Sequence, residues 1–375
     1  MLPYGRQWID EADVAAVTEV LTSDWLTTGP WVRDFEHALA ARAGVAHAVS
    51  CTSGTAALHI AYAAAGIGPG DEVITTPMTY VATASGAMHH GATVVFADIE
   101  EDTGNIDPAA VEAVVSERTR VIAGVDYAGQ PVDIDRLNTI AHRVGAVTVE
   151  DAAHSVGSTD KGRPVGALAD LTTFSFFPTK NMTTAEGGAV LTDDDALALR
   201  ADEFHKIGVS RDRSTYRHPD EGAWWYEVPS IGLNYRLSDV HAALGLSQLG
   251  KLDDFKARRT ALFARYQEAL AGVDGLRVPT VRSWVDPTWH LYPVRILGGR
   301  RREVFEKLRA AGIGVQVNYI PVYWHPVFED LGYRRGLCPN AERFYEEEIS
   351  LPMFARLSYD EQDRVIDTLR GILGA

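Results

Sequence analysis

One segment governs the interpretation of this chain: Leu171-Thr172-Thr173-Phe174-Ser175-Phe176-Phe177-Pro178-Thr179-Lys180. Its apolar and aromatic residues predict a buried strand that ends shortly before a lysine. The chain has six lysines, and the other five lie in a polar turn or in charged, helix-like stretches. An amine held inside a protein loses hydration, which lowers its pKa and favours its use as a nucleophile. The alternative is an ordinary lysine that extends its ammonium from a strand end into solvent.

A second segment ends in an acidic residue and a histidine. Residues Val144 to His154 predict a short buried strand followed by Asp151 and His154. In a parallel sheet the carboxyl ends of the strands open onto the ligand crevice, so a carboxylate there faces a bound cofactor. Pyridoxal phosphate requires a lysine for its Schiff base and a carboxylate that keeps its pyridine nitrogen protonated. Lys180 and Asp151 match these two requirements, although Asp151 taken alone would more often be a helix cap or a surface turn residue.

A third segment predicts an anion site. Cys51-Thr52-Ser53-Gly54-Thr55 precedes a helix that runs through Ala64. The free N–H groups at a helix start, the positive end of its dipole and two hydroxyls together suit a phosphate. The simpler interpretation is an N-cap, because Ser and Thr favour that position. Together, the three segments supply a phosphate site, a ring partner and a Schiff-base lysine in the order expected of a type I pyridoxal-phosphate enzyme.

On these residues the chain resembles the DegT/StrS family of nucleotide-sugar aminotransferases over nearly its whole length. Eight motifs in register carry the resemblance. They are Tyr4-Gly5-Arg6-Gln7, Leu26-Thr27-Thr28-Gly29-Pro30, Thr52-Ser53-Gly54-Thr55-Ala56-Ala57-Leu58, Thr76-Pro77-Met78-Thr79-Tyr80-Val81-Ala82-Thr83, Glu150-Asp151-Ala152-Ala153-His154, Phe174-Ser175-Phe176 before Lys180, Glu186-Gly187-Gly188-Ala189-Val190 and Gly232-Leu233-Asn234-Tyr235-Arg236-Leu237.

The expected fold is α/β, and the resemblance implies the fold type I of pyridoxal-phosphate transferases. Helix-like and strand-like segments alternate along the chain, which indicates a mostly parallel central sheet with helices on both faces. We expect a large cofactor-binding domain over residues 1–245 and a smaller C-terminal α+β domain over residues 246–375. A long helix over about 238–271, with Ser238 as its N-cap, is predicted to connect them.

The resemblance also implies roles for individual residues. Lys180 would bind the cofactor as a Schiff base and move the proton, Asp151 would pair with the pyridine nitrogen, and His154 would lie beside the ring. Tyr80 would stack on the ring face, although it could also be an ordinary core aromatic residue. The phosphate would be held by Ser53, Gly54, Thr55 and Ser175, and by Asn234 of the other subunit of a homodimer with shared active sites. The nucleotide-sugar would meet Tyr4, Asp24, Trp25, Leu26, Thr27, Val317, Asn318 and Tyr319.

One departure from the family pattern concerns the sugar pocket. Many relatives have a histidine where Phe177 stands and a small residue where Pro178 stands. A subset of the family replaces the lysine with histidine and dehydrates sugars instead of aminating them. Because Lys180 is present here, transamination is the expected chemistry.

Composition excludes several other classes of function. The formal net charge is −16 and no basic patch stands out, which argues against nucleic acid or an anionic membrane as partner. Two cysteines provide no disulfide framework, and the sequence has neither a signal-peptide hydrophobic region at its start nor a span of transmembrane length, so we expect a cytoplasmic protein. The twelve histidines include no zinc-type His/Cys spacing, so we predict no metal site.

The leading hypothesis is a pyridoxal-phosphate-dependent aminotransferase. It would aminate C4 of a nucleotide-linked 4-keto-6-deoxyhexose with L-glutamate as donor. Residues 125–129 and 318–323 are similar to the branch of the family that aminates C4 of UDP-linked sugars on the way to pseudaminic acid. The alternatives are C3 amination of a 3-keto sugar, a related enzyme acting on a cyclitol, and a non-enzymatic regulator. Whether the nucleotide is UDP or TDP stays open.

Overall fold

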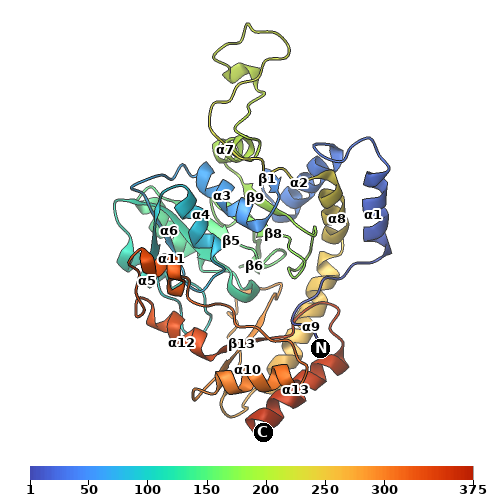
Figure 1. Cartoon of the computed structure of the whole chain (residues 1–375), viewed down its shortest axis with the longest axis vertical. Helices are drawn as coiled ribbons and strands as arrows, with labels where there is room; N and C mark the ends of the chain where they lie inside the picture. Colours follow the sequence, from blue (N-terminus) through green and yellow to red (C-terminus); the bar gives the residue numbers. More distant parts are fainter. Residues whose placement is uncertain (375) are drawn as a thin grey trace.

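A seven-stranded sheet forms the centre of the computed structural model, which describes residues 1–374 (Figure 1). The strand order is β1-β9-β8-β5-β4-β2-β3. The strands span β1 His47–Cys51, β2 Glu72–Thr75, β3 Thr93–Phe96, β4 Thr119–Val125, β5 Val147–Asp151, β8 Leu171–Ser175 and β9 Gly188–Thr192. Of these strands only β9 runs against the others. The predicted mostly parallel sheet is therefore confirmed.

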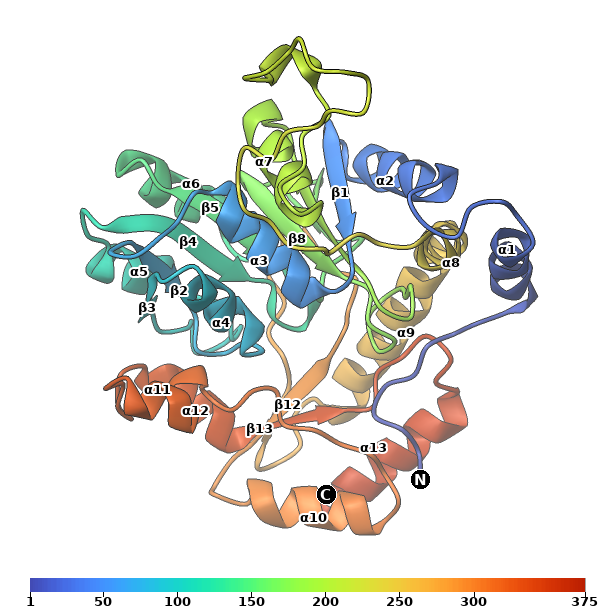
Figure 2. The same cartoon turned by 45° about the horizontal axis from the view of Figure 1, so that its top comes forward.

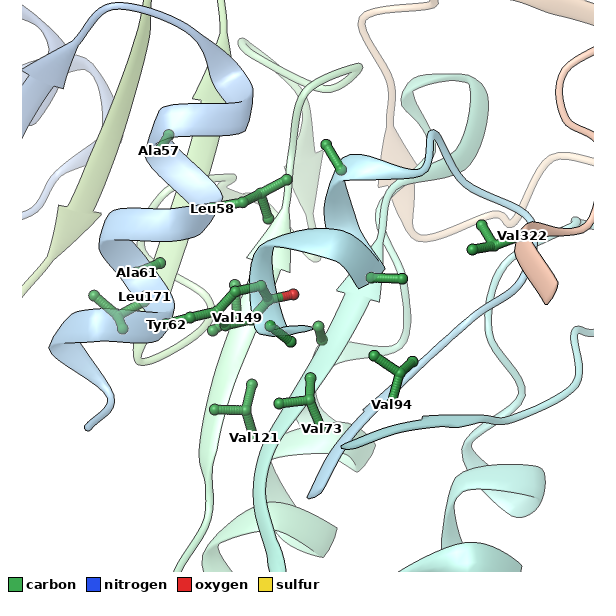
Figure 3. Close-up of a cluster of buried hydrophobic side chains, with 14 of the residues drawn as sticks. Ala57, Leu58, Ala61, Tyr62, Val73, Val94, Val121, Val149, Leu171 and Val322 are labelled. Carbon is green, nitrogen blue, oxygen red and sulfur yellow. The ribbon is translucent and has the colours of Figure 1, made fainter. Parts of the chain in front are cut away.

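Helices cover both faces of this sheet because both faces of its strands are apolar. Neighbouring residues of one strand belong to hydrophobic cores on opposite faces of the sheet. Val121 packs beneath α3 and α4, whereas Ile122 packs against α6 on the other face. Figure 3 shows the first of these cores, with Val73, Val121 and Val149 of the sheet facing the α3 helix. The first face carries α3 Gly54–Ala64, α4 Ala82–His89 and α7 Asp195–His205; the second carries α2 Pro30–Ala43, α5 Pro108–Val114, α6 Ile134–Arg143 and α8 Asp239–Leu249.

The C-terminal part has its own sheet and core. Strands β10 Leu276–Arg277, β12 Tyr292–Ile296 and β13 Glu348–Leu351 pair antiparallel, and α10 Arg301–Ala310 and α13 Tyr359–Leu373 pack against them (Figure 2). Helices α11 Pro326–Asp330 and α12 Pro339–Glu347 lie beside the large sheet, and a minor sheet joins β11 Val285–Asp286, β6 Thr159–Asp160 and β7 Arg163–Pro164. A smaller α+β part was expected here; the domain boundary near residue 245 stays a prediction.

The single long helix predicted for about 238–271 is wrong. Two helices, α8 and α9 Leu252–Leu270, occupy this range, and Gly250 and Lys251 separate them. The Lys251 ammonium lies 2.6 Å from the buried carboxylate of Asp13 and 2.8 Å from the more exposed carboxylate of Asp10. Asp10 is the N-cap of α1 Glu11–Leu21, so this contact ties the break to the first helix. Helical periodicity continues across the break, which is why the sequence did not reveal it. The predicted N-cap Ser238 is present, since its hydroxyl accepts a hydrogen bond from the His241 amide.

A projecting arm, residues 206–236, extends beyond α7 and is the segment drawn furthest from the sheet in Figure 1. It contains one short 3₁₀ turn, Arg213–Thr215. Large apolar side chains on it lie in solvent, with Trp224 79% and Ile231 87% exposed. Exposed apolar groups gathered on one segment are typical of an interaction surface. Among the helices of residues 1–374, none has both the length and the apolar character to cross a membrane.

Candidate active site

A cavity of about 380 Å³ opens at the carboxyl ends of β4, β5 and β8. It lies where a parallel α/β sheet is expected to bind its ligand. Most of the residues predicted for the site line it together. These are Tyr4, Ser53, Gly54, Thr55, Tyr80, Asp151, His154, Ser175, Lys180, Asn318 and Tyr319.

Lys180 and Asp151 both line this cavity. Asp151 is the last residue of β5, and Lys180 follows the end of β8 by five positions. Burial lowers the pKa of the Lys180 ammonium to about 8, although the nearby Asp151 carboxylate opposes this shift. Burial also raises the pKa of Asp151, while a hydrogen bond from Thr83 and the charge of Lys180 act in the opposite direction. The site therefore holds an amine that can lose its proton near neutral pH beside a carboxylate in a desolvated setting.

The Asp151 carboxylate is oriented by two donors. The Thr83 hydroxyl donates to Oδ2 at 2.6 Å, and the Ala153 amide donates to Oδ1 at 3.2 Å. Thr83 lies in the first turn of α4, and its oxygen is 2.7 Å from that of Thr79. Thr83 belongs to one of the eight family motifs, but no role for it was predicted from the sequence. Its spacing from Tyr80, one helical turn, is the signal that could have indicated it.

The start of α3 forms the predicted anion site. Ser53 caps the helix, and its hydroxyl accepts from the Ala56 amide at 3.1 Å. A side chain at Gly54 is excluded, because a Cβ there would lie 2.7 Å from the Cβ of Ser175. The first N–H groups of a helix have no partner inside it, so those of Gly54 and Thr55 are available to a ligand. Thus β8 and α3 bring the Ser175 hydroxyl and a helix N-terminus to one place.

Two histidines border the cavity next to Lys180. His154 and His290 are 5% and 6% exposed, and their ring centroids are 4.3 Å apart. Burial lowers the pKa of each imidazole well below 6.5, and the Lys180 charge adds to this effect. His290 precedes β12 in the C-terminal part, and no sequence pattern indicated that it would reach the site. Glu186 and Phe177 also line the cavity. Phe177 was expected near the sugar pocket only as a departure from the family pattern, and Glu186 had no predicted role.

A polar network holds the segment Asn318–Tyr319 against the cavity. The Asn318 amide donates to Glu348 Oε2 at 2.7 Å, and the Asn318 side chain donates to the Tyr4 hydroxyl at 2.7 Å. Glu348 is fully buried, and burial raises its pKa to about 8. The Tyr127 hydroxyl donates to the Asn318 carbonyl. Residues from both ends of the chain are therefore fixed beside the carboxyl ends of the strands.

Six predicted residues do not line this cavity within one chain. Asp24, Trp25, Leu26 and Thr27 are exposed and lie beside the start of α8, where the Asp239 amide donates to the Leu26 carbonyl. Val317 precedes the lining pair Asn318–Tyr319 without joining it. Asn234 is exposed at the base of the projecting arm and pairs with Lys206. Across residues 1–374, no group of three or more His, Cys, Asp or Glu side chains is placed to hold a metal ion.

Comparisons with known proteins agree with this geometry. The family model described as the DegT/DnrJ/EryC1/StrS aminotransferase family matches residues 7–370. The Bacillus subtilis (strain 168) spore coat polysaccharide biosynthesis protein SpsC is 42% identical over 378 residues, covering 99% of this chain and 97% of that protein.

Solved structures extend the match. Helicobacter pylori PseC, an aminotransferase involved in the biosynthesis of pseudoaminic acid, superposes with a TM-score of 0.93 at 33% identity, covering 100% of this chain and 99% of that chain. Spr1654 from Streptococcus pneumoniae in its PLP-form also gives a TM-score of 0.93, at 32% identity over 100% of this chain and 98% of that chain. The resemblance drawn from the eight motifs is confirmed: the chain belongs to the DegT/DnrJ/EryC1/StrS aminotransferase family and is an enzyme of that class.

Proposed function

We propose that this protein transfers an amino group from L-glutamate to C4 of a nucleotide-linked 4-keto-6-deoxyhexose, with pyridoxal phosphate as cofactor. The observation that carries the proposal is the placement of Lys180 and Asp151 in one cavity at the carboxyl ends of β8 and β5. The sugar substrate is supported by the family and by the names of its relatives SpsC and PseC. C4 amination is supported by the likeness of residues 125–129 and 318–323 to the pseudaminic branch.

The residues of the cavity fit pyridoxal phosphate. The amine of Lys180 suits the aldehyde, the buried carboxylate of Asp151 suits a protonated ring nitrogen, and the α3 N-terminus suits the phosphate. The missing Cβ at Gly54 leaves the backbone bare where a phosphate would approach Ser175. When bound, the cofactor supplies an electron sink for the pair released as a bond to the amino-bearing carbon breaks.

The chain's own residues then have separate tasks. Lys180 Nζ takes the proton from the α-carbon of the donor and returns one to C4 of the sugar, a role that suits an amine with a pKa of about 8. Asp151 would hold the ring nitrogen of the bound cofactor in its protonated form, and the hydroxyl of Thr83 holds the Asp151 carboxylate in place. Tyr80, which lines the cavity beside α4, offers its flat ring to the cofactor face.

The proposal includes a second copy of the chain. Among the described residues that line the cavity there is no arginine, whereas Asp151 and Glu186 add negative charge. A nucleotide diphosphate and a dicarboxylate donor both need cationic partners. Asn234 and Arg236 lie at the base of the projecting arm, outside their own cavity. We propose that they complete the site of the other subunit in a homodimer.

Turnover with defined substrates tests the proposal. The purified enzyme is given L-glutamate and a panel of UDP- and TDP-linked 4-keto and 3-keto sugars, and a cyclitol ketone. Formation of 2-oxoglutarate reports transfer, and NMR of the product locates the new amino group. Reduction with borohydride should attach the cofactor to Lys180, and Lys180→Ala should lose both the trapping and the turnover. Amination at C3, or of the cyclitol alone, would overturn the substrate assignment.

A further inference from the structure

The surroundings of His154 contain a hydrogen bond whose function is unassigned. The Tyr319 hydroxyl lies 3.0 Å from His154 Nε2, and the two rings are nearly parallel, with an interplanar angle of 22°. The His154 ring also packs beside that of His290. Nδ1 of His154 is buried and has no hydrogen-bond partner among the described residues. The imidazole is therefore held through one nitrogen.

The imidazole of His154 carries a single proton near neutral pH. Its environment is buried, and the Lys180 charge further disfavours a second proton. A neutral imidazole exists as one of two tautomers, with the proton on Nδ1 or on Nε2. The hydrogen bond to Tyr319 can form with either, so the choice depends on which groups are left without partners.

Counting unpaired groups favours the Nδ1–H tautomer. With the proton on Nδ1, the Tyr319 hydroxyl donates to Nε2, and only the Nδ1–H group lacks a partner. With the proton on Nε2, both the Nδ1 lone pair and the Tyr319 O–H lack a protein partner. The two tautomers differ by the Tyr319 O–H, which is half-buried, so the difference is at most the roughly 1–3 kcal/mol that an unpaired buried polar group costs. The arrangement with Tyr319 as donor is therefore the lower in free energy.

Tyr319 is itself fixed through the residue before it. Four hydrogen bonds converge on Asn318: from its amide to Glu348, from its side chain to Tyr4 and to Ser350, and from the Tyr127 hydroxyl to its carbonyl. This placement links the C-terminal part of the chain to the loop that follows Asp151. A donor held this firmly can select one tautomer and one ring orientation.

We propose that Tyr319 is a positioning residue that acts through His154. Its hydroxyl fixes the imidazole as the Nδ1–H tautomer and holds its ring against the cavity beside Lys180. While this bond is kept, Nε2 is occupied and is not a free base, so proton transfer is left to Lys180. The inference rests on the proposed function only for the identity of the reaction; the protonation pattern of His154 can be observed without turnover.

Nitrogen NMR of the cofactor-loaded enzyme tests the proposal. The protein is labelled at its histidine rings, and the His154 signals are assigned by their loss in His154→Leu. We expect a protonated Nδ1 and an unprotonated Nε2 that stay unchanged from about pH 6 to about pH 9. In Tyr319→Phe the single tautomer should give way to a mixture, and kcat/KM should fall roughly tenfold. In the His154→Leu background the same change should lower kcat/KM by a smaller factor than it does in the wild-type background.

Tyr127→Phe is the matched control, because it removes a hydroxyl bonded to the same segment but not to His154. Its His154 signals should remain those of the wild-type enzyme. If Tyr319→Phe left the tautomer unchanged, or Tyr127→Phe shifted it equally, Tyr319 would be an ordinary structural residue and the proposal would be wrong. Should His154→Leu fail to fold, His154→Asn provides the assignment and the background. Failure of the sugar substrates alone would affect the proposed function and leave this result intact.

Discussion

At the scale of single residues, the pKa of Lys180 determines when its amine can react. Burial lowers this pKa from an ordinary 10.5 to about 8. The neutral amine, which is the nucleophile, therefore becomes abundant as the pH rises through about 8. We expect the rate at which the cofactor-free protein takes up pyridoxal phosphate to rise between about pH 6 and about pH 8.5 and then to level off. Stopped-flow absorbance measures this rate, and a rise that continued to pH 10 would show an unperturbed lysine.

Asp151→Asn separates binding from chemistry at the same scale. An amide keeps the size of the carboxylate but cannot stabilise a protonated ring nitrogen. The variant should still bind the cofactor, while kcat falls by about 10²–10³-fold, a loss typical of removing one charge-stabilising group. Thr83→Val, which removes the hydroxyl bonded to Asp151, should give a smaller loss. Near-normal turnover in Asp151→Asn would mean that this residue is structural.

At the scale of elements, one carboxylate joins two helices that are far apart in sequence. Asp239, the first residue of α8, is fully buried and accepts hydrogen bonds from the amides of Gly29 at 2.7 Å and Val32 at 3.3 Å. Gly29 is the N-cap of α2 and has no side chain of its own to cap the helix. The Ser238 cap of α8 could be predicted from the sequence, whereas this cap of α2 could not, because its donor and acceptor are 210 positions apart.

Removing this shared cap should therefore destabilise the fold. Asp239→Ala leaves the buried Gly29 amide and the partly buried Val32 amide unpaired, and we expect a loss of about 3 kcal/mol in the free energy of unfolding. A calorimetric scan should show a lower unfolding temperature for Asp239→Ala than for the wild type. The unfolding temperature of Asp239→Asn should lie between these two. Asp254→Ala is the control, because Asp254 is an exposed acid in the first turn of α9. If Asp239→Ala and Asp254→Ala lost equal free energy of unfolding, Asp239 would contribute no more than an ordinary surface acid.

Features that depend on neighbouring residues could be predicted from the sequence. Contacts between residues far apart in the chain, and breaks in regular helices, could not. Short-range patterns indicated Asp151 and Lys180 after their strands and Ser53 at the capped start of α3. The structure places all three residues in one cavity. His290 reaches the same cavity only because the C-terminal part folds back, which no local signal records. The break at Gly250 was hidden because apolar spacing continues on both sides.

At the scale of the whole molecule, the proposed homodimer can be tested by mixing two inactive proteins. Lys180→Ala and Asn234→Ala are combined, and their subunits are allowed to exchange. If Asn234 serves the other subunit, a mixed dimer contains one site in which both residues are wild type, and activity should return in part. The control is each variant mixed with itself. No recovery despite proven exchange, followed by mass spectrometry, would place Asn234 in its own chain's site.

Cleavage of the projecting arm should break the chain without separating the folded parts of the molecule. Trp224, the large side chain most open to solvent on the arm after Ile231, offers a protease with aromatic specificity a ready site. A cut there would leave α1 and α2 on one fragment and α8 on the other. The hydrogen bonds that Asp13 and Asp239 accept would still join the two fragments. The nicked protein should thus elute as one folded species and divide only in denaturant. If a second subunit covers the arm, cleavage should slow as protein concentration rises, so the rate of digestion reports assembly.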